Sequence, residues 1–269
     1  MLLAFTRAVP PSIGRCELTY IAREPIDYAR AVQEHAAYET CLRALGCEVR
    51  RLPDAPDLPD SVFVEDTAIV FDDLAVITRP GAASRRPERD AMAAALGPHR
   101  RLAFIESPGT LDGGDVLVTP GRVFVGISGR TNPDGVRQLA THLAPLGLDV
   151  LPVPVSGCLH LKSAVTVAGH RPGARGSQGA TSDTILVINP AWVDPAVFAG
   201  LALIEVDPQE PAAANVLRIA DRLVCAEAHP RTRQRLEAYG LPTVAVPAAE
   251  LAKAEGGVTC CSVMLTRRG

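Results

Sequence analysis

A pattern that recurs five times along the chain constrains its fold more than any other feature. In each copy a helix-like segment stops at a glycine, a short β-like run follows, and a proline ends that run. Glycine is favoured directly after a helix because it tolerates left-handed backbone angles. The glycines are 51, 50, 53 and 40 residues apart, which indicates an internal repeat. The five copies are Gly46–Pro53, Gly97–Pro108, Gly147–Pro154, Gly200–Pro208 and Gly240–Pro247.

The segments before these glycines complete the repeating unit. Between Asp134 and Leu146 the apolar residues fall at helical spacing, with Asp134 as the predicted N-cap. Pro25 is predicted to open the first helix. Segments 67–78 and 115–125 are each typical of two strands joined by a turn. Each unit is therefore predicted to run strand, strand, helix, strand.

The two ends of the chain supply the strands that one unit lacks. No hairpin precedes the first helix, but Leu2–Thr6 and Cys261–Thr266 are both strand-like. Pairing of these terminal runs would complete the fifth unit, close a ring and leave few open sheet edges. We therefore predict an α/β fold, a five-fold pseudosymmetric α/β propeller of ββαβ units, with residues 1–269 forming a single domain.

Composition and charge exclude several functional classes. Apolar residues make up 47% and charged residues 21% of the chain, which excludes extensive disorder. A net charge of −3 without a long basic run argues against nucleic acid as a partner. The longest apolar runs are strand-sized, so no membrane span is predicted, and the N-terminus lacks a cleavage-site pattern, which favours a cytoplasmic location.

The cysteines and glycines exclude two further kinds of site. Seven cysteines, an odd number, with no C-x-x-C pair indicate reduced thiols and argue against both a disulfide framework and a zinc site. No phosphate-binding glycine motif follows a strand, which argues against a nucleotide site.

A polar or reactive cluster occupies the same place in every unit, after the proline and before the hairpin. Equivalent positions in a ring of repeats converge on its axis, so these residues are predicted to share one pocket. Carboxylates, a histidine and a thiol together favour nucleophilic catalysis by cysteine. The five clusters are Asp60–Asp66, Asp112–Asp115, His160–Ser163, Asn215 and Cys260–Cys261.

Each cluster also has a plain structural interpretation when it is taken alone. Cys260 is compatible with a small buried apolar residue, and His160 with a hydrogen-bonded core residue. Asp112 and Asp115 flank two glycines and suit an ordinary turn. The pair Glu65–Asp66 is different, because it interrupts apolar runs where adjacent charges cost free energy unless they are paired. Because a polar or reactive cluster stands at the same point in all five units, the five clusters taken together favour a functional interpretation.

Seven motifs that span nearly the whole chain carry a resemblance to a known family. They are Asp60–Asp66, Thr78–Arg86, Thr110–Asp115, Arg130–Asn132, Leu159–Ser163, Ala213–Asn215 and Gly257–Ser262. In this order they resemble the dimethylarginine dimethylaminohydrolase family of the guanidine-modifying (pentein) superfamily. The resemblance implies a five-fold α/β propeller, in agreement with the repeat.

The resemblance also implies a catalytic set. Cys260 matches the nucleophile, His160 the general acid/base, and Asp112 the carboxylate that orients the histidine. Cys261 is not expected to react, because successive side chains of a β run point to opposite faces. Asp115 is predicted to cap the backbone of the turn at Gly113–Gly114.

The substrate-binding residues follow from the same resemblance. Asp66, with Glu65, would face the guanidinium group of the substrate. Arg85 and Arg130 would hold its α-carboxylate. Asp60 and the backbone of Leu18 would contact its α-amino end. The full set is Leu18 (through its backbone), Asp60, Glu65, Asp66, Arg85 and Arg130.

Two segments stand apart from these motifs. Residues 12–20, which contain Leu18, are predicted to form a lid loop. Residues 170–182 are longer than the corresponding turn of the family and are predicted to be an insertion at the rim.

The implied reaction is hydrolysis of N-omega-methylated arginines, asymmetric dimethylarginine and monomethylarginine, to citrulline and dimethylamine or methylamine through a covalent thiouronium on cysteine. It needs no metal and no organic cofactor, only a small guanidino substrate, and the chain would act as a monomer or homodimer. Two alternatives stay open: arginine deiminase or amidinotransferase-like activity on another guanidino compound, and a non-catalytic propeller that binds a macromolecule. The complete set of Cys260, His160 and Asp112 favours an enzyme.

Overall fold

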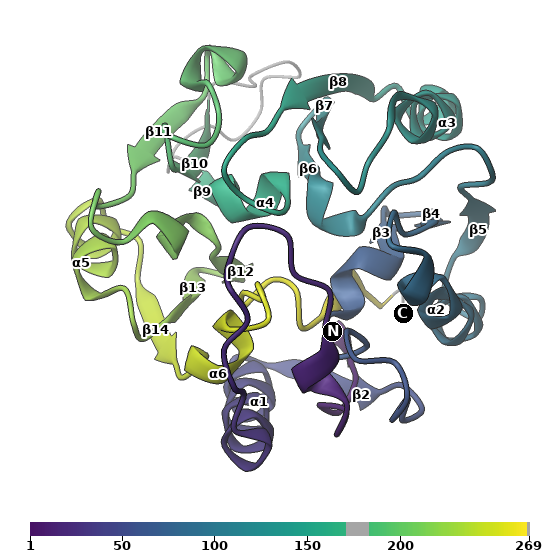
Figure 1. Cartoon of the computed structure of the whole chain (residues 1–269). Coiled ribbons are helices and arrows are strands. Elements are labelled where there is room, and N and C mark those ends of the chain that lie inside the picture. Colours follow the sequence, from purple (N-terminus) through teal and green to yellow (C-terminus); the bar gives the residue numbers. More distant parts are fainter. Residues whose placement is uncertain (171–182, 268–269) are drawn as a thin grey trace.

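The computed structural model describes residues 1–170 and 183–267, and the strands of this part form five sheets of three strands each. In every sheet the middle strand lies antiparallel to the first strand and parallel to the third. The sheets are arranged around a common centre (Figure 1). They consist of β15 (Val263–Thr266), β1 (Leu2–Thr6) and β2 (Cys47–Arg51); β3 (Ala68–Val70), β4 (Leu74–Ile77) and β5 (Arg101–Phe104); β6 (Val116–Thr119), β7 (Arg122–Ile127) and β8 (Asp149–Pro154); β9 (Val165–His170), β10 (Thr184–Ile188) and β11 (Ala202–Glu205); and β12 (Leu217–Ile219), β13 (Arg222–Ala226) and β14 (Thr243–Val246).

Four of the five units use an α-helix to cross from the middle strand to the parallel third strand. These helices are α1 (Tyr28–Ala44), α2 (Arg89–Leu96), α3 (Pro133–Leu143) and α5 (Pro230–Ala238). The fourth unit differs, because its crossing segment contains only the 3-10 helix η7 (Pro195–Phe198) before Gly200. Two prolines, Pro190 and Pro195, interrupt this short connection, so the helix predicted before Gly200 does not form.

The first and last strands of the chain lie in one sheet. Leu2 of β1 is opposite Thr266 of β15 in an antiparallel pair, and β1 also runs parallel to β2. The two terminal runs therefore supply the hairpin that the sequence leaves missing before α1.

The first helix starts later than its proline predicts. The N-cap of α1 is Asp27, whose carboxylate accepts a hydrogen bond from the backbone N–H of Arg30 at 3.1 Å. Pro25 therefore lies outside the helix. A carboxylate that bonds the first turn defines the helix start more strongly than the fixed φ of a nearby proline does.

The start of α3 also corrects the sequence prediction. Its N-cap is Asn132, and Pro133 is the first helical residue, so Asp134 lies inside the first turn. Proline in the first helical position has no N–H to leave unsatisfied, and the cap therefore lies two residues before the predicted Asp134.

Gly97 also differs from the prediction that each repeat glycine is left-handed. Its φ of −50° is right-handed, whereas the other four repeat glycines have positive φ.

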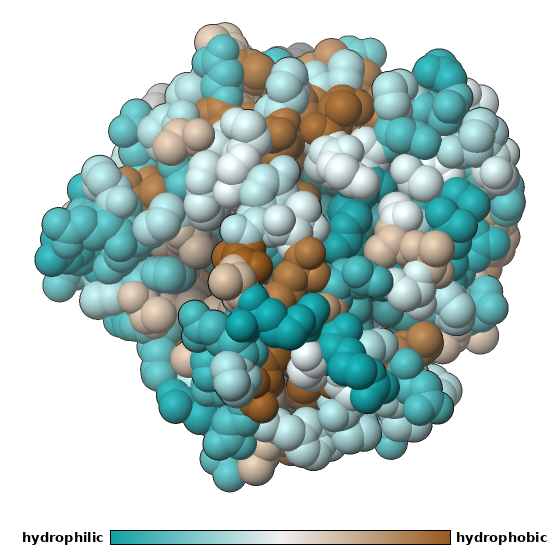
Figure 2. Space-filling view, viewed as in Figure 1, coloured by the Kyte–Doolittle hydropathy of each residue, from teal (hydrophilic) through white to brown (hydrophobic). Residues whose placement is uncertain are grey.

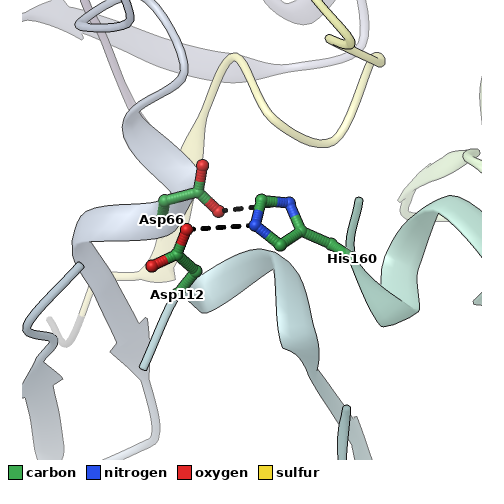
Figure 3. A group of neighbouring side chains, drawn as sticks. All are labelled: Asp66, Asp112 and His160. Carbon is green, nitrogen blue, oxygen red and sulfur yellow. Dashed lines mark hydrogen bonds and ion pairs between the residues drawn. The ribbon is translucent and has the colours of Figure 1, made fainter. Parts of the chain in front are cut away.

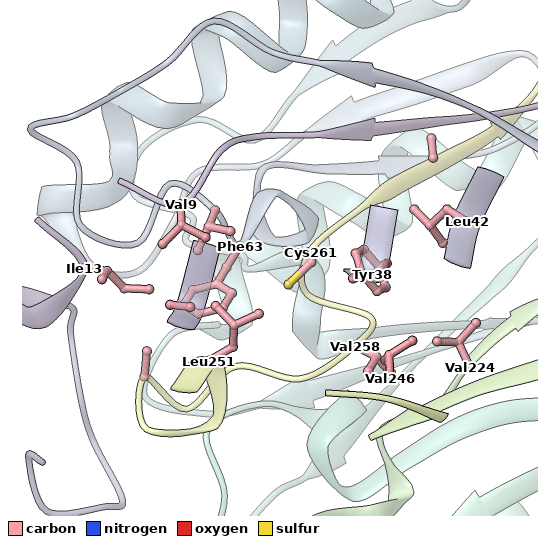
Figure 4. Packing of buried hydrophobic residues seen from close by; sticks show 14 of the residues in the cluster. Val9, Ile13, Tyr38, Leu42, Phe63, Val224, Val246, Leu251, Val258 and Cys261 are labelled. Carbon is pink, nitrogen blue, oxygen red and sulfur yellow. The ribbon is translucent and has the colours of Figure 1, made fainter. Parts of the chain in front are cut away.

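The core is divided among the units, and the largest cluster surrounds α1. Tyr38 and Leu42 of α1 pack with Val246 and Val258, and the Cys261 side chain lies in the same cluster (Figure 4). Cys261 is only 1% exposed, so it belongs to the core. In the described part of the chain, no helix combines the length and the apolar character that crossing a bilayer requires.

A short turn precedes the first strand of every sheet. Four of these turns are helical, and the fifth is the turn at Thr259–Cys261 before β15. They coincide with the polar clusters of the sequence. The helical ones are η2 (Val64–Thr67), η4 (Gly113–Asp115), α4 (Leu161–Ala164) and η8 (Pro211–Ala214).

The cap of α3 gives a test of the fold. The Asn132 side chain accepts hydrogen bonds from the N–H groups of Gly135 at 2.9 Å and Thr110 at 3.0 Å. We expect Asn132→Ala to lower the free energy of unfolding by about 1–2 kcal/mol, because both donors lose their partner. Urea denaturation measures this change. Asp134→Ala is the control and should cost less than about 0.5 kcal/mol; a larger effect of the control would contradict the cap assignment.

Candidate active site

A histidine lies between two buried carboxylates at the centre of the molecule. His160 Nε2 is 3.0 Å from Asp112 Oδ2, and His160 Nδ1 is 3.8 Å from Asp66 Oδ1 (Figure 3). Asp66 belongs to η2, Asp112 directly precedes η4, and His160 directly precedes α4. Turns of three consecutive units therefore meet here, as the repeat predicts.

The two carboxylates keep the histidine protonated. Burial alone would lower the pKa of His160, but the charge of Asp66 and the hydrogen bond to Asp112 raise it to about 9, with a further contribution from Asp115. The imidazole is therefore an imidazolium at neutral pH. It can act as a general acid.

Asp66 links the histidine to a buried arginine. Its Oδ2 is 2.5 Å from Arg85 Nη1, and its Oδ1 accepts a hydrogen bond from the N–H of Gly114 at 2.9 Å. Burial would raise the pKa of Asp66, but His160 and Arg85 hold it well below its usual value. A Cβ on Gly114 would lie 2.6 Å from His160 Nδ1, so this close approach needs glycine.

The two predicted carboxylate-binding arginines have different surroundings. Arg85 is 3% exposed, and it also contacts Glu88 at 2.9 Å and donates to the carbonyl of Phe63 at 2.9 Å. Arg130 Nη1 is 3.9 Å from Asp112 Oδ2, and Asp112 is the one carboxylate recorded within ion-pair range of Arg130 in the described residues. Arg130 is thus the freer of the two guanidinium groups.

The Cys260 thiol lies in the turn before β15. Its Sγ accepts a hydrogen bond from the N–H of Gly257 at 3.4 Å, and its carbonyl accepts one from the N–H of Glu65 at 3.0 Å. Burial raises the pKa of Cys260 to about 12, and the negative charges of Glu65 and Asp66 contribute. The thiol is therefore protonated at neutral pH.

One small cavity brings most of the predicted residues together. Its volume is about 10 Å³, the space of about one water molecule. Asp112 does not line it but adjoins it through His160 and Arg130. The predicted residues that line the cavity are Asp60, Asp66, Arg85, Arg130, His160 and Cys260.

Glu65 lies outside the lining of this cavity. Its Oε1 is 2.6 Å from Lys162 Nζ, and its Oε2 accepts a hydrogen bond from Thr259 Oγ1 at 2.7 Å. All three residues line a different cavity of about 270 Å³. Adjacent side chains of a 3-10 turn point about 120° apart, so Glu65 and Asp66 face different sides.

A second polar network joins the histidine turn to the cysteine turn. Asn215 Nδ2 donates to the carbonyl of Lys162 at 3.0 Å and to Thr259 Oγ1 at 2.9 Å, and Asn215 Oδ1 accepts from the N–H of Thr259 at 3.0 Å. The sequence predicted no role for Lys162 or Thr259. Their position beside His160 and Cys260 in the polar clusters was the available signal.

Asp115 has a different partner from the one predicted. Its carboxylate accepts hydrogen bonds from the N–H of Leu161 at 2.9 Å and from Ser128 Oγ at 2.6 Å. It does not cap the turn at Gly113–Gly114. Instead it fixes the first residue of α4, directly after His160.

The predicted lid segment, purple in Figure 1, lies near the common centre of the five sheets. Leu18 is partly buried there against the cluster around α1. The neighbouring N–H of Glu17 donates to both carboxylate oxygens of Asp60 at 3.2 Å. The predicted insertion at 170–182 lies outside the described residues except for His170, which ends β9.

The donor chemistry of the central trio does not favour a metal centre. One ligand atom each of Asp66, Asp112 and His160 lie within 4.8 Å of one another in the described part of the chain. However, His160 Nε2 already contacts Asp112 Oδ2 at 3.0 Å, and Asp66 Oδ2 already contacts Arg85 Nη1 at 2.5 Å, so protein partners occupy these ligand atoms. The trio is better suited to holding a proton.

Comparisons with known proteins show the family to which the chain belongs. A family model described as N,N dimethylarginine dimethylhydrolase, eukaryotic, matches residues 21–164. N(G),N(G)-dimethylarginine dimethylaminohydrolase of Streptomyces coelicolor is 39% identical over 266 residues, 97% of this chain and 96% of that protein. The protein of the same name from Pseudomonas aeruginosa is 32% identical over 239 residues, 88% of this chain and 89% of that protein. The solved structure of a cysteine-to-serine mutant of the Pseudomonas aeruginosa enzyme complexed with citrulline has a TM-score of 0.88 at 29% identity and covers 98% of both chains.

The raised pKa of His160 is directly measurable. We expect an NMR titration of its imidazole to give a pKa of about 9, against an ordinary value of 6.5. Asp112→Asn should lower this pKa because it removes an adjacent negative charge. Asp149→Asn, an exposed change of the same charge, is the control. An unchanged pKa in Asp112→Asn would contradict the assigned contact.

The same shift has a defined effect on stability. A pKa raised in the folded state means that the folded protein binds the proton more tightly than the unfolded chain does. The contribution of His160 to the free energy of unfolding is therefore complete below pH 6.5 and is lost as the pH rises toward 9. In Asp112→Asn the loss should still begin near pH 6.5 but end at lower pH and be smaller in total, which thermal melts at a series of pH values would detect.

Proposed function

The chain belongs to the dimethylarginine dimethylaminohydrolase family, and we propose that it hydrolyses N-omega-methylated arginines to citrulline with release of dimethylamine or methylamine. One observation carries the proposal: the Cys260 thiol lines the same cavity as the His160 imidazolium, which is bonded to Asp112. A nucleophile and a general acid therefore face one space.

The walls of the cavity suit the two ends of such a substrate. Asp66 supplies negative charge for the guanidinium from the cavity wall. Glu65, which lies outside the cavity lining, adds negative charge nearby and supports the cysteine turn by accepting a hydrogen bond from Thr259. We assign the α-carboxylate to Arg130, with Arg85 beside it.

The α-amino group, on the same carbon as the α-carboxylate, is proposed to face the lid. We assign the α-amino group to Asp60 and to the backbone carbonyl of Leu18. Asp60 lines the cavity, and the N–H of Glu17 already ties the lid to it.

The charge of the substrate activates the thiol. In the free protein, burial raises the pKa of the Cys260 thiol, and the negative charges of Glu65 and Asp66 raise it further. A bound guanidinium reverses the sign of the local field and lowers the pKa of the thiol. Cys260 therefore reacts fastest when a cationic substrate is bound.

The bonds then change in two stages. The Cys260 sulfur attacks the guanidinium carbon, and His160 donates its proton to the departing amine as the C–N bond breaks. This leaves an S-alkylthiouronium on sulfur and a neutral imidazole. His160 next takes a proton from water, whose oxygen adds to the same carbon. The C–S bond then breaks, its electron pair returns to sulfur as the thiolate, and the added hydroxyl loses its proton to solvent to give citrulline. Asp112 stabilises the imidazolium that returns.

The pairing of β15 with β1 supports two structural proposals. We propose that the five sheets form a closed ring and that residues 1–269 are one domain. Cytoplasmic location and a monomeric or homodimeric state stay predictions from the sequence.

A citrulline-release assay tests the function. The purified protein is given asymmetric dimethylarginine, monomethylarginine or arginine at equal concentrations. We expect kcat/KM to be at least about tenfold higher for the methylated substrates than for arginine, a difference of about 1.4 kcal/mol. Preference for arginine would instead indicate a deiminase, and no release from any of the three would overturn the proposal.

The two adjacent cysteines provide a matched pair of variants. We expect Cys260→Ser to lose on the order of 10³-fold or more in kcat, because a hydroxyl is a far weaker nucleophile than a thiolate. Cys261→Ser should keep most of the activity but lower the melting temperature, because a hydroxyl then lies in the apolar cluster around α1. Trapping the covalent adduct by mass spectrometry should locate it on Cys260. Equal losses of kcat in the two variants would refute the assignment.

The two arginines are expected to behave differently when truncated. Arg130→Ala should raise KM for methylarginines on the order of 10²-fold with little effect on stability. Arg85→Ala should lower the free energy of unfolding by about 3–5 kcal/mol, because it removes the buried guanidinium that pairs with both Asp66 and Glu88. Steady-state kinetics and urea denaturation separate the two effects. Arg137→Ala on the exposed face of α3 is the control, and a wild-type KM in Arg130→Ala would place the substrate carboxylate elsewhere.

A further inference from the structure

The lid was predicted at residues 12–20, and in the structure the side chain of Arg23 binds it, so residues 12–23 are called the lid from here on. Arg23 Nη1 donates to the carbonyl of Gly14 at 2.7 Å, and Arg23 Nη2 donates to the carbonyl of Cys16 at 2.5 Å. In the space-filling view, atoms cover the centre of the face that the lid crosses, and strongly hydrophilic and hydrophobic residues lie side by side there (Figure 2).

One carboxylate from the other end of the chain binds three consecutive N–H groups of the lid. Glu255 Oε2 accepts from Thr19 N at 2.9 Å, and Glu255 Oε1 accepts from Tyr20 N at 2.6 Å and from Ile21 N at 3.0 Å. Bonds to an ionised acceptor are about twice as strong as neutral ones. Consecutive backbone N–H groups also form a natural binding site for an anion.

The backbone of Glu255 is in a conformation that glutamate rarely adopts. Its φ is +55°, and in the described residues only Ala220 shares a positive φ without being glycine. Such a conformation costs about 1–2 kcal/mol for a residue with a Cβ. Glycine would fit this backbone without strain, but it would offer no carboxylate to the lid.

The bonds to the lid fix the peptide group that carries the Leu18 carbonyl. Thr19 N–H and Leu18 C=O belong to one planar trans peptide, so they point in opposite directions. Glu255 holds this peptide by its N–H, while Asp60 holds the N–H of Glu17 on the other side of Leu18. The direction of the Leu18 carbonyl is therefore set by two carboxylates.

The size of the cavity shows that the lid must also release. A space of about 10 Å³ holds about one water molecule, and a methylarginine is many times larger. Glu255 itself lines both this cavity and the neighbouring cavity of about 360 Å³, which Tyr20 and Ile21 of the lid also line. The bonds from Glu255 are therefore among those that open when substrate enters and re-form when it is enclosed.

We propose that Glu255 is a positioning residue that latches the lid over Cys260 and aims the Leu18 carbonyl at the substrate's α-amino group. The aiming part rests on the proposed function. The latch is a property of the lid alone, so the two parts have separate readouts.

The test uses Glu255→Gly, which keeps the left-handed backbone and removes the carboxylate. Glu255→Gln is the second variant, because its amide oxygen can replace only part of the carboxylate's acceptor capacity. Glu24→Gln, an exposed change of the same charge near the lid, is the control. Circular dichroism melts should show that Glu255→Gly folds, with a melting temperature within a few degrees of wild type, because relief of backbone strain offsets lost hydrogen bonds.

Two readouts report on the latch without any hydrolysis. Trypsin should cut after the exposed Arg15 and Arg23 on the order of tenfold faster in Glu255→Gly than in wild type. Alkylation of Cys260 by neutral iodoacetamide, measured by peptide mass spectrometry, should be faster in Glu255→Gly by a similar factor. Glu255→Gln should fall between these values, and the control should match wild type. Wild-type rates for both readouts in Glu255→Gly would overturn the latch, whether or not the protein hydrolyses methylarginines.

Kinetics test the aiming part. KM for methylarginine should rise on the order of tenfold in Glu255→Gly, while kcat changes less than KM. An open lid with an unchanged KM would overturn the aiming role and leave a latch only. If wild type releases no citrulline, the proposed function fails and the aiming role fails with it, but proteolysis and alkylation still decide the latch.

Discussion

An alternating row of buried charges, Arg85, Asp66, His160 and Asp112, is the interaction on which the rest of the site depends. Each charge is almost completely removed from water, so each needs the opposite charge beside it. The row links the central turns of three consecutive units, and a shift of any one turn would leave a charge without a partner. The site is therefore organised before any substrate arrives, which is the condition under which fixed charges contribute most to catalysis.

The row also helps to explain why the Cys260 thiol is protonated in the free protein. Two carboxylates, Glu65 and Asp66, raise the pKa of Cys260 together with burial. The same carboxylates attract a guanidinium cation, so the feature that suppresses the thiolate also selects the molecule that restores it. Because its thiol is protonated in the free protein, Cys260 reacts with neutral electrophiles more slowly than an activated thiolate would.

The repeat made the fold and the meeting of the clusters predictable, because register along a repeat determines position around an axis. The contact of His160 with Asp112 follows from that register and from the family resemblance. The directions of individual side chains could not be predicted from this register. Glu65 and Asp66 are neighbours in sequence but face different cavities, since a tight turn rotates them apart. Asp115 bonds Leu161, 46 residues away, which no local turn rule can anticipate.

The fifth polar position shows what the repeat adds beyond convergence. Asn215 carries no charge and takes no part in the proposed chemistry, yet it occupies the place that His160 and Cys260 occupy in their own units. Its amide both donates and accepts, so it can join the backbone of the histidine turn to both groups of Thr259. A carboxylate could only accept, and a hydroxyl could not span both turns. Five turns that point to one axis thus allow some units to supply the reacting groups while another fixes the spacing between them.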